Sequence, residues 1–527
     1  MTATARTLAA AGLIVTAAFF VSRLLGWLRI VVISTIYGAG ADLDSYFAAF
    51  RIPDAIFQLV AAGALSSALI PVLSGLVSSG DERSAWAVVS TVVNLMLIAL
   101  LGLSVVMAIG APVIIPIVTP GFDTVQTELT VRLSRIMLLS PILLAVGAVA
   151  TSVLNTYGRF ASAALAPLLY NGAIIVAAVL LSPVMGVEAL AVGVVLGSLA
   201  HLAVQLPPVL RHRAFDYDFR LDLKDPLARQ ALLLMAPRAI GLSAAQITFV
   251  VNTTLASGLF TGAIVAYNVA FTILQIPIGI IGIPLGVVLL PTMSRAVASG
   301  AVREFGSLVV RSLRLLLYVM LFVTAVAMVL RRQVVSLLFD YGNFDAAAID
   351  TTANTLLFFL IGLAAHSMIV VLARAFYAGK DTRTPVIAAL VSVAVNVVVS
   401  VATVGLLGLS GLALGIAVGA WVETGILTVL LWQRNSGMAL DSVGKGVAEF
   451  ALGALLAAVA AFGVVRATEA MVGLEPAKIT LVAQSTVAFG AAAITYVLYS
   501  RLLRIPELAT SVEMVRLALR RGTPASP

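Results

Sequence analysis

Arginine is the residue type in this sequence with the clearest potential for chemistry, because nine arginines fall inside long apolar segments. A charge at the centre of a bilayer is costly, so it normally faces a cavity or a partner. Guanidinium suits phosphate because it binds phosphate through two parallel hydrogen bonds. An excess of such cations over acids therefore predicts an anionic ligand. The nine residues are Arg23, Arg29, Arg51, Arg132, Arg135, Arg238, Arg311, Arg314 and Arg374.

The nine arginines differ in how deep they lie within the apolar segments, and this depth decides the role that we expect for each. Arg23, Arg29 and Arg51 lie deepest, and we expect them to have a functional role, with an ion pair to Asp44 or Asp54 as the main alternative. Arg311 and Arg314 lie in the first turns of their segment, so we expect both to extend to the membrane surface. For Arg132, Arg135, Arg238 and Arg374 either role stays open. The other intramembrane acids are chiefly Glu423, with Glu449 near a segment end.

Other polar residues are sparse. Gln246, Asn252 and Asn396 are interpreted first as interhelical hydrogen-bonding groups and second as substrate contacts. The three histidines, His201, His212 and His366, lack metal-ligand spacing, and there is no cysteine. The Gly-Lys pairs at Gly379 and Gly444 lack the rest of a phosphate-binding loop. We therefore expect a transporter that is not an enzyme and has no metal or cofactor, with the membrane potential or a coupling cation supplying energy.

The elements that position these residues are membrane helices. Hydrophobic residues make up 61% of the 527 residues and charged residues 11%, whereas soluble domains carry about 25% charged residues. The run after Arg6 is too long for a cleaved signal peptide and is taken as a retained helix. The class is all-α, a polytopic membrane protein with about fourteen helices. The expected spans are 9–36, 43–76, 84–118, 125–157, 160–181, 186–210, 230–257, 261–294, 304–330, 346–378, 384–406, 409–433, 446–465 and 479–500.

The basic residues between these spans predict the topology. Nineteen lie on the side of the N-terminus, and only Arg331, Arg332, Arg466 and Lys478 lie on the other side. The positive-inside rule then places both termini in the cytoplasm. A net charge of +8 would suggest nucleic acid for a soluble chain, but here the placement of the charges explains it, so no nucleic-acid partner is expected.

A faint internal repeat occurs at an offset of about 220 residues. Pro71-Val-Leu-Ser74 matches Pro291-Thr-Met-Ser294, and Gly158-Arg159 matches Gly379-Lys380. Parallel repeats are a transporter architecture with substrate between the lobes. The expected organisation is a six-helix lobe over 1–211, a cytoplasmic linker over 212–229, a second six-helix lobe over 230–435, two more helices over 436–503 and a cytoplasmic tail over 504–527.

Two segments are rich in residues that disturb helices. The stretch from Gln275 to Gly286 contains Pro277, Pro284 and three glycines, which predicts a kink or an unwound, moving segment. Pro53 and Gly63 hold comparable places in the second span.

Four motifs resemble a known family. They are Ser22-Arg23-Leu-Leu-Gly26-Trp-Leu-Arg29, Asp44-Ser-Tyr-Phe-Ala-Ala-Phe50-Arg51-Ile-Pro53, Leu289-Leu-Pro291-Thr-Met-Ser294 and Leu372-Ala-Arg374-Ala-Phe376-Tyr-Ala-Gly-Lys-Asp381-Thr-Arg-Thr-Pro385. They are similar to the MurJ (MviN) family of lipid II flippases, in the MOP superfamily. The resemblance runs from the first span to about the twelfth.

The resemblance implies two six-helix lobes around a central cavity, with two further helices forming a lipid-tail groove. It implies movement of undecaprenyl-pyrophosphate-linked disaccharide-peptide from the inner to the outer leaflet for peptidoglycan synthesis, by alternating access. The implied substrate-binding residues are Arg23, Arg29, Arg51, Asp44 and Arg374. The implied partners are the lipid-linked pyrophosphate, membrane lipids and proteins of cell-wall synthesis.

Three positions depart from the family pattern. Phe57-Gln58 stands where a basic pair is common, Phe271-Thr272 where Asp-Arg is common, and Ile30 where an acid is usual. The second lobe is therefore expected to make fewer phosphate contacts. The alternatives are a flippase for another lipid-linked oligosaccharide, a cation-coupled drug exporter of the same superfamily, which should carry buried carboxylates rather than arginines, and a scaffold for cell-wall synthases.

The charge asymmetry predicts that the 211–229 loop is cytoplasmic. Because the chain has no cysteine, a single Ala214→Cys variant reports sidedness without background. We expect an impermeant thiol reagent to label it only after the cells are opened. Labelling in intact cells would overturn the topology.

Overall fold

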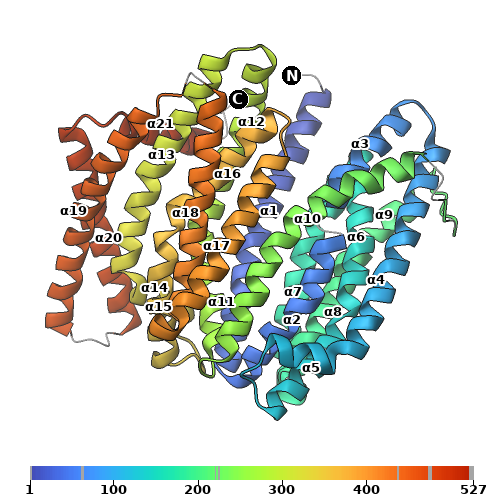
Figure 1. Ribbon diagram of the computed structural model, residues 1–527, viewed down its shortest axis with the longest axis horizontal. Helices are drawn as coiled ribbons and strands as arrows, with labels where there is room; N and C mark the ends of the chain where they lie inside the picture. The colour runs from blue at the N-terminus through green and yellow to red at the C-terminus, as the bar shows by residue number, and fades with distance from the viewer. Residues whose placement is uncertain are drawn as a thin grey trace. The chain divides into compact units, whose positions relative to one another are not determined.

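The computed structural model describes residues 3–60, 64–219, 221–222, 226–435, 438–472 and 477–521, and the described residues form helices and no strands (Figure 1). The helices are α1 Ala3–Tyr37, α2 Ala41–Val60, α3 Ala64–Ser78, α4 Glu82–Val118, α5 Thr124–Met137, α6 Leu139–Thr156, α7 Phe160–Met185, α8 Glu188–Ala203, α9 Leu206–Leu210, α10 Pro226–Ser257, α11 Ala263–Pro277, α12 Ile283–Ala298, α13 Val302–Val329, α14 Arg331–Phe339, α15 Ala346–Ile361, α16 Leu363–Ala378, α17 Arg383–Leu407, α18 Leu409–Arg434, α19 Leu440–Val472, α20 Lys478–Leu502 and α21 Pro506–Arg521.

The expected membrane spans are present as helices. Among the described residues, eleven helices are long and apolar enough to cross a membrane, or twelve if the bent pair α15–α16 is one span. Each of these twelve falls on a span expected from the sequence. Of the other two expected spans, 43–76 includes residues outside the described parts, Gly63 among them. The span 230–257 lies within α10, where the side chains are described only in part. The protein is therefore a multi-pass membrane protein.

The chain forms two compact units. The first comprises residues 1–265 and 341–345. In it α7 packs on α1 and α8, α2 packs on α5 and α10, and α3 packs on α6 and α10. Its apolar core lies around Trp86, Leu100 and Val153, which are buried.

The second unit comprises residues 266–340 and 346–527. There α17 packs along α18, α13 packs on α16 and α19, and α19 packs on α20. Figure 1 shows α19 and α20 as a pair beside α13. Tyr318, Phe450 and Tyr496 form an aromatic cluster among α13, α19 and α20, with ring centroids 4.9–5.4 Å apart.

Helix ends support the internal repeat. Gly80 after α3 and Gly300 after α12 both have a left-handed backbone, with φ of 81° and 70°. Each amide donates to the carbonyl three residues earlier at 3.1 Å. A second pair is Gly186 and Gly408, with φ of 59° and 55°, at the ends of α7 and α17. These equivalent turns recur at offsets of 220 and 222 residues.

The third matching turn corrects the expected register by one residue. The residue with positive φ is Gly158 in the first copy and Lys380 in the second, at 71° and 60°. Gly379 has φ of −82° and belongs to the preceding helix end. Gly158 therefore corresponds to Lys380, because the turn geometry decides the match rather than the shared Gly letter. The lobe boundaries at 211, 230 and 435 stay predictions.

Several expected single helices are interrupted. The segment from Gln275 to Gly286 contains a π-helical turn over Ile278–Gly282 between α11 and α12, which confirms a local irregularity there and gives it a form typical of functional helices. The span 346–378 bends by 45° at Gly362, and the span 125–157 breaks at Leu138. These two breaks were not expected from the sequence.

A glycine stripe brings α18 against α17. Gly411, Gly415 and Gly419 lie four residues apart on α18, so they share one face. A Cβ atom at Gly415 would lie 2.2 Å from the Ser400 hydroxyl oxygen and 2.9 Å from the Asn396 carbonyl oxygen. Small residues at this spacing let membrane helices approach closely.

Gly415→Ala should therefore force α17 and α18 apart, because the Asn396 carbonyl belongs to the backbone and cannot rotate away. We expect a loss of about 1–3 kcal/mol of stability, measured as a lower unfolding temperature in detergent. The matched control is Gly425→Ala on the same helix, where nothing lies within 4 Å of the added carbon. Equal unfolding temperatures for the two variants would contradict the packing role.

Candidate functional site

A cavity of about 330 Å³ in the first unit is lined by one arginine and one aspartate from different helices. Arg29 enters from α1 and Asp54 from α2, with Tyr170 on α7 and His201 on α8. The remaining lining residues are Phe50, Pro53, Phe57, Ser140, Leu144 and Pro167. The volume lies at the lower end of the range for small-molecule pockets, so it fits part of a ligand such as a phosphate-bearing group.

Arg29 is the basic side chain that lines this cavity. Its Nε atom is buried and has no hydrogen-bond partner among the described residues. Its guanidinium carbon lies 6.0 Å from the centre of the Tyr170 ring, within reach of a cation–π attraction. A buried donor without a partner is costly, so the geometry leaves a place for an acceptor that a ligand can supply.

Asp54 and Arg51 set the charge beside Arg29. The charges of Arg51 and Arg29 both act on Asp54, whose Oδ2 also accepts a hydrogen bond from Gln246 of α10 at 3.2 Å. Two cations and one carboxylate leave an excess of one positive charge in this region. The cavity is therefore suited to an anion.

Arg51 itself is buried between α2 and α10 and does not line the cavity. It is 9% exposed, its Nε donates to the Thr253 hydroxyl at 3.3 Å, and its guanidinium lies 4.8 Å from the Phe249 ring centre. Arg51 is thus placed to act on a ligand through its charge and through the position of Asp54.

Arg23 lies on another face of α1. It is exposed, and six residues separate it from Arg29, which is about one and two-thirds helical turns. The two side chains therefore point in different directions, and the structure does not bring Arg23 to the cavity.

Both carboxylate oxygens of Asp44 accept hydrogen bonds from backbone amides. Asp44 is 2% exposed, and its two oxygens accept hydrogen bonds from the amides of Gly262 at 2.5 Å and Val265 at 2.9 Å. These amides lie at the start of α11, where the helix dipole favours a negative charge. The structure thus places Asp44 in a structural contact, apart from the Arg29 cavity.

Proline shapes the wall of the cavity that α2 provides. Pro53 has no amide hydrogen, so the carbonyl of Ala49 loses its usual helical partner. The hydroxyl of Ser134 on α5 donates to that carbonyl at 3.2 Å. The kink-prone turn is therefore held by a neighbouring helix directly beside Asp54.

The remaining sequence candidates have separate surroundings. Arg374, in the second unit, donates to the Val370 carbonyl at 2.9 Å and lies against Gly286, where a Cβ would be 2.8 Å from its Nη1. Arg132 pairs with Glu188 at 2.8 Å. The side chain of Arg238 lies outside the described residues.

Arg314 is partly buried, and the expectation that it extends to the membrane surface stays a prediction. Its Nε contacts the Glu507 carboxylate of α21 at 2.5 Å, its Nη1 donates to the Ser442 carbonyl, and its guanidinium lies 5.4 Å from the Phe450 ring centre. Arg314 therefore links α13, α19 and α21. Arg311 on the same helix is exposed.

Two of the uncharged polar candidates make hydrogen bonds within the protein. Gln246 binds Asp54 of another helix, as the interhelical interpretation predicts. Asn396 donates to Ser400 within its own helix at 3.4 Å. Among the described residues, no three histidine or acidic side chains come together as a metal-ligand group.

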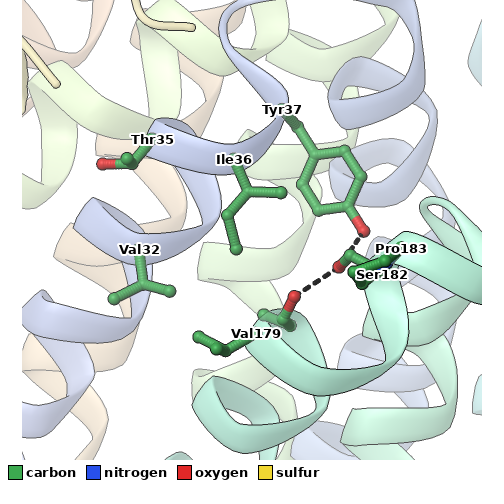
Figure 2. Close-up of a pocket in the computed structure, with 8 residues that line it drawn as sticks. Val32, Thr35, Ile36, Tyr37, Val179, Ser182 and Pro183 are labelled. Carbon is green, nitrogen blue, oxygen red and sulfur yellow. Dashed lines mark hydrogen bonds between the residues drawn. The ribbon is translucent and has the colours of Figure 1, made fainter. Parts of the chain in front are cut away.

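A second cavity of about 600 Å³ lies between α1 and α7 (Figure 2). The Tyr37 hydroxyl contacts the Ser182 hydroxyl at 2.5 Å and donates to the Gly186 carbonyl at 2.7 Å. The described side chains that line this cavity carry no charge. It therefore lacks the group needed to bind an anion, and its polar contacts fix α1 to α7.

Sequence reasoning missed Tyr170, His201 and Ser140 as cavity residues. Tyr170 and Asn171 interrupt an otherwise apolar segment after Pro167, which is a usable signal. His201 carried none, because a single histidine in an apolar helix is ordinary. Phe57, noted as a departure from the basic residue common in the family, lines the cavity and makes it less basic.

The comparisons with known proteins agree on one family. The profile of the family described as lipid II flippase MurJ matches residues 33–483. The lipid II flippase MurJ of Burkholderia cenocepacia is 32% identical over 431 residues, covering 80% of this chain and 83% of that protein.

Solved structures agree on the fold. A structure of lipid II flippase MurJ in an inward closed conformation matches with a TM-score of 0.78 and 22% identity, covering 93% of this chain and 99% of that one. An inward-facing multidrug resistance MATE family transporter of the MOP superfamily matches with a TM-score of 0.67 and 18% identity, covering 79% and 94%.

The contacts of Asp44 predict a structural loss. Asp44→Ala leaves the buried amides of Gly262 and Val265 without an acceptor, which should cost about 1–3 kcal/mol and lower the unfolding temperature. Asp42→Ala in the same helical turn is the control, because Asp42 is exposed. An Asp44→Ala protein with normal stability and no transport would instead assign Asp44 to the substrate.

Proposed function

Since this chain belongs to the MurJ family of lipid II flippases, we propose that it moves lipid II from the inner to the outer leaflet by alternating access. It is a transporter of the MOP superfamily, with no catalytic residue of its own. In this proposal it resides in the bacterial cytoplasmic membrane with both termini in the cytoplasm. The charge asymmetry along the chain supports that orientation.

The observation that carries the proposal is the buried Nε of Arg29 in the cavity of the first unit. The Nε of Arg29 donates a hydrogen bond to a phosphate oxygen of the substrate pyrophosphate. That oxygen is the acceptor that the surrounding side chains do not offer to this atom. Arg51 and Asp54 act behind it. Arg51 adds positive potential, and Asp54 restrains the local geometry through its contact with Gln246.

The shape of the cavity favours the head group over the tail. Phe50, Phe57 and Tyr170 give aromatic walls around one guanidinium, and a volume near 330 Å³ is too small for a polyprenyl chain. The tail therefore stays in lipid, while the pyrophosphate is recognised. A carboxylate-lined cavity would suit a cationic drug. Here Arg29 and Asp54 line the cavity, and Arg51 beside Asp54 gives the region an excess of one positive charge.

The moving segments in this proposal are the interrupted helices. The π-helical turn over Ile278–Gly282 and the bend at Gly362 provide backbone positions where a helix can change direction. Pro53 beside the cavity provides a third. Such breaks allow parts of a helix to move as rigid pieces.

The membrane potential is a sufficient energy source. One charge moving through the field gains about 2.3 kcal/mol per 100 mV. About two negative charges leaving a negative interior would gain about 4–5 kcal/mol on the same scale. A coupling cation is therefore not required by the energetics.

Substitution of Arg29 tests the proposal. Arg29→Ala should abolish flipping and leave membrane abundance near normal, because it removes a charge rather than a partner of a buried ion pair. Arg29→Lys should retain part of the activity, since an ammonium keeps the charge and loses the two-pronged geometry. The measurement is lipid II leaflet distribution after depletion of the native protein, together with membrane abundance.

The control is Arg295→Ala, because Arg295 is exposed and bonds to Thr292 of its own helix. Normal flipping by Arg29→Ala would refute the binding role. Low abundance of Arg29→Ala, restored by a second Asp54→Asn change, would make Arg29 a structural partner of Asp54. Supplying a different lipid-linked oligosaccharide in the same assay separates lipid II from other pyrophosphate lipids.

A further inference from the structure

A basic groove lies between the end of α20 and α21 in the second unit. Its volume is about 760 Å³, and its lining includes Arg501, Arg504 and Arg516, with Glu513 as the acid. Leu508 and Val512 provide an apolar wall. Three guanidinium groups against one carboxylate give the groove a net charge of +2.

Glu507 lies nearby but does not neutralise this groove. It is 7% exposed, and its Oε1 contacts Arg314 on α13 at 2.5 Å. Because Glu507 pairs with Arg314, its negative charge does not neutralise the three arginines that line the groove. The same pair fixes α21 to the rest of the unit, so the groove has a defined wall.

The turn that presents Arg504 is strained. The amide of Ile505 donates to the Ser500 carbonyl at 2.9 Å, and Arg504 has a φ of 53°. This is the helix-ending turn in which glycine is the usual residue, as it is at Gly158 and Gly300. A left-handed conformation is unfavourable for arginine, so a side chain kept there points to a role for its charge.

The groove also lies where a membrane helix ends. Leu502 and Leu503, at the end of α20, are 81% and 50% exposed. Arg501 and Arg504 flank them. Apolar side chains beside cations are typical of the level at which hydrocarbon meets lipid head groups. The positive charge of the groove, its apolar wall and its place at the level of the lipid head groups together suit an anionic, amphipathic molecule.

We propose that the groove between α20 and α21 binds the head group of an anionic phospholipid, with Arg501, Arg504 and Arg516 around the phosphate and the acyl chains beside Leu502 and Leu503. This site is independent of the Arg29 cavity. Lipid bound there holds α21 at the membrane surface and couples it, through Glu507 and Arg314, to α13 and α19.

A fluorescent reporter tests the site. The chain has no cysteine, so a single Thr510→Cys on the exposed side of α21 can carry an environment-sensitive dye. The full-length protein in neutral detergent is titrated with phosphatidylglycerol, with phosphatidylcholine and with inorganic phosphate. We expect a saturable response to phosphatidylglycerol alone, weakened by high salt.

Removal of the arginines gives the decisive comparison. Each single change should weaken phosphatidylglycerol binding about fivefold, the factor for one basic side chain at an anionic surface. Arg504→Gly is the sharpest variant because it also relieves the strained turn, so its unfolding temperature should stay equal or rise while its lipid affinity falls. Arg303→Gln, an exposed residue of α13 with the same loss of charge, should bind normally.

Three results would overturn the proposal. The first is an equal response to phosphatidylcholine, which would make the groove merely apolar. The second is a response to inorganic phosphate at similar concentration, which would make the ligand a soluble anion. The third is unchanged phosphatidylglycerol binding in the combined Arg501→Gln, Arg504→Gly and Arg516→Gln variant with the fold intact.

Discussion

The constraint on which this structure depends is that a charge inside an apolar helix bundle must be matched by another group. Three arginines differ in how far they meet it. Arg314 is matched by a carboxylate and a carbonyl, and Arg51 by a hydroxyl and an aromatic face. Arg29 lies near the aromatic ring of Tyr170, but its buried Nε has no hydrogen-bond partner among the described residues and lies beside a cavity. In the proposed function, an unsatisfied hydrogen-bonding group is therefore what distinguishes a binding arginine from a structural one.

The same reasoning applies to backbone groups. Membrane helices must satisfy their amides and carbonyls internally because lipid offers no partner. Where a proline or a helix start breaks the pattern, a side chain supplies the partner: Ser134 for the carbonyl of Ala49, and Asp44 for the amides of Gly262 and Val265. The two side chains that supply these partners are Asp44 on α2 and Ser134 on the neighbouring helix α5. The irregular positions needed near a cavity are thus compatible with stable packing.

Long apolar patterns in the sequence were sufficient to predict the membrane spans and the all-helical class, because a run of about twenty apolar residues has few structural alternatives to a membrane helix. They were insufficient for contacts that join distant segments. Nothing local indicates that Asp44 meets Gly262, 218 residues away, or that Arg314 meets Glu507 in a segment expected only as a tail. The deep position of Arg29 was enough to select it, whereas Tyr170 and His201 become part of the site only when α7 and α8 pack.

The two copies of the repeat share a scaffold and differ in chemistry. Their helices end in equivalent turns, yet the turn that holds Gly158 in the first copy holds Lys380 in the second. The following residue, Asp381, pairs with Arg434 at 2.6 Å. Partial burial raises the pKa of Asp381, but hydrogen bonds from Thr384, Arg434 and Arg383 outweigh it and hold that pKa below its usual range. In the second unit Phe271 packs on Phe359 where the family often has a charged residue. Divergence between the copies therefore places Arg29 and Asp54 at a cavity in the first unit, whereas the second unit has charged side chains at its helix ends.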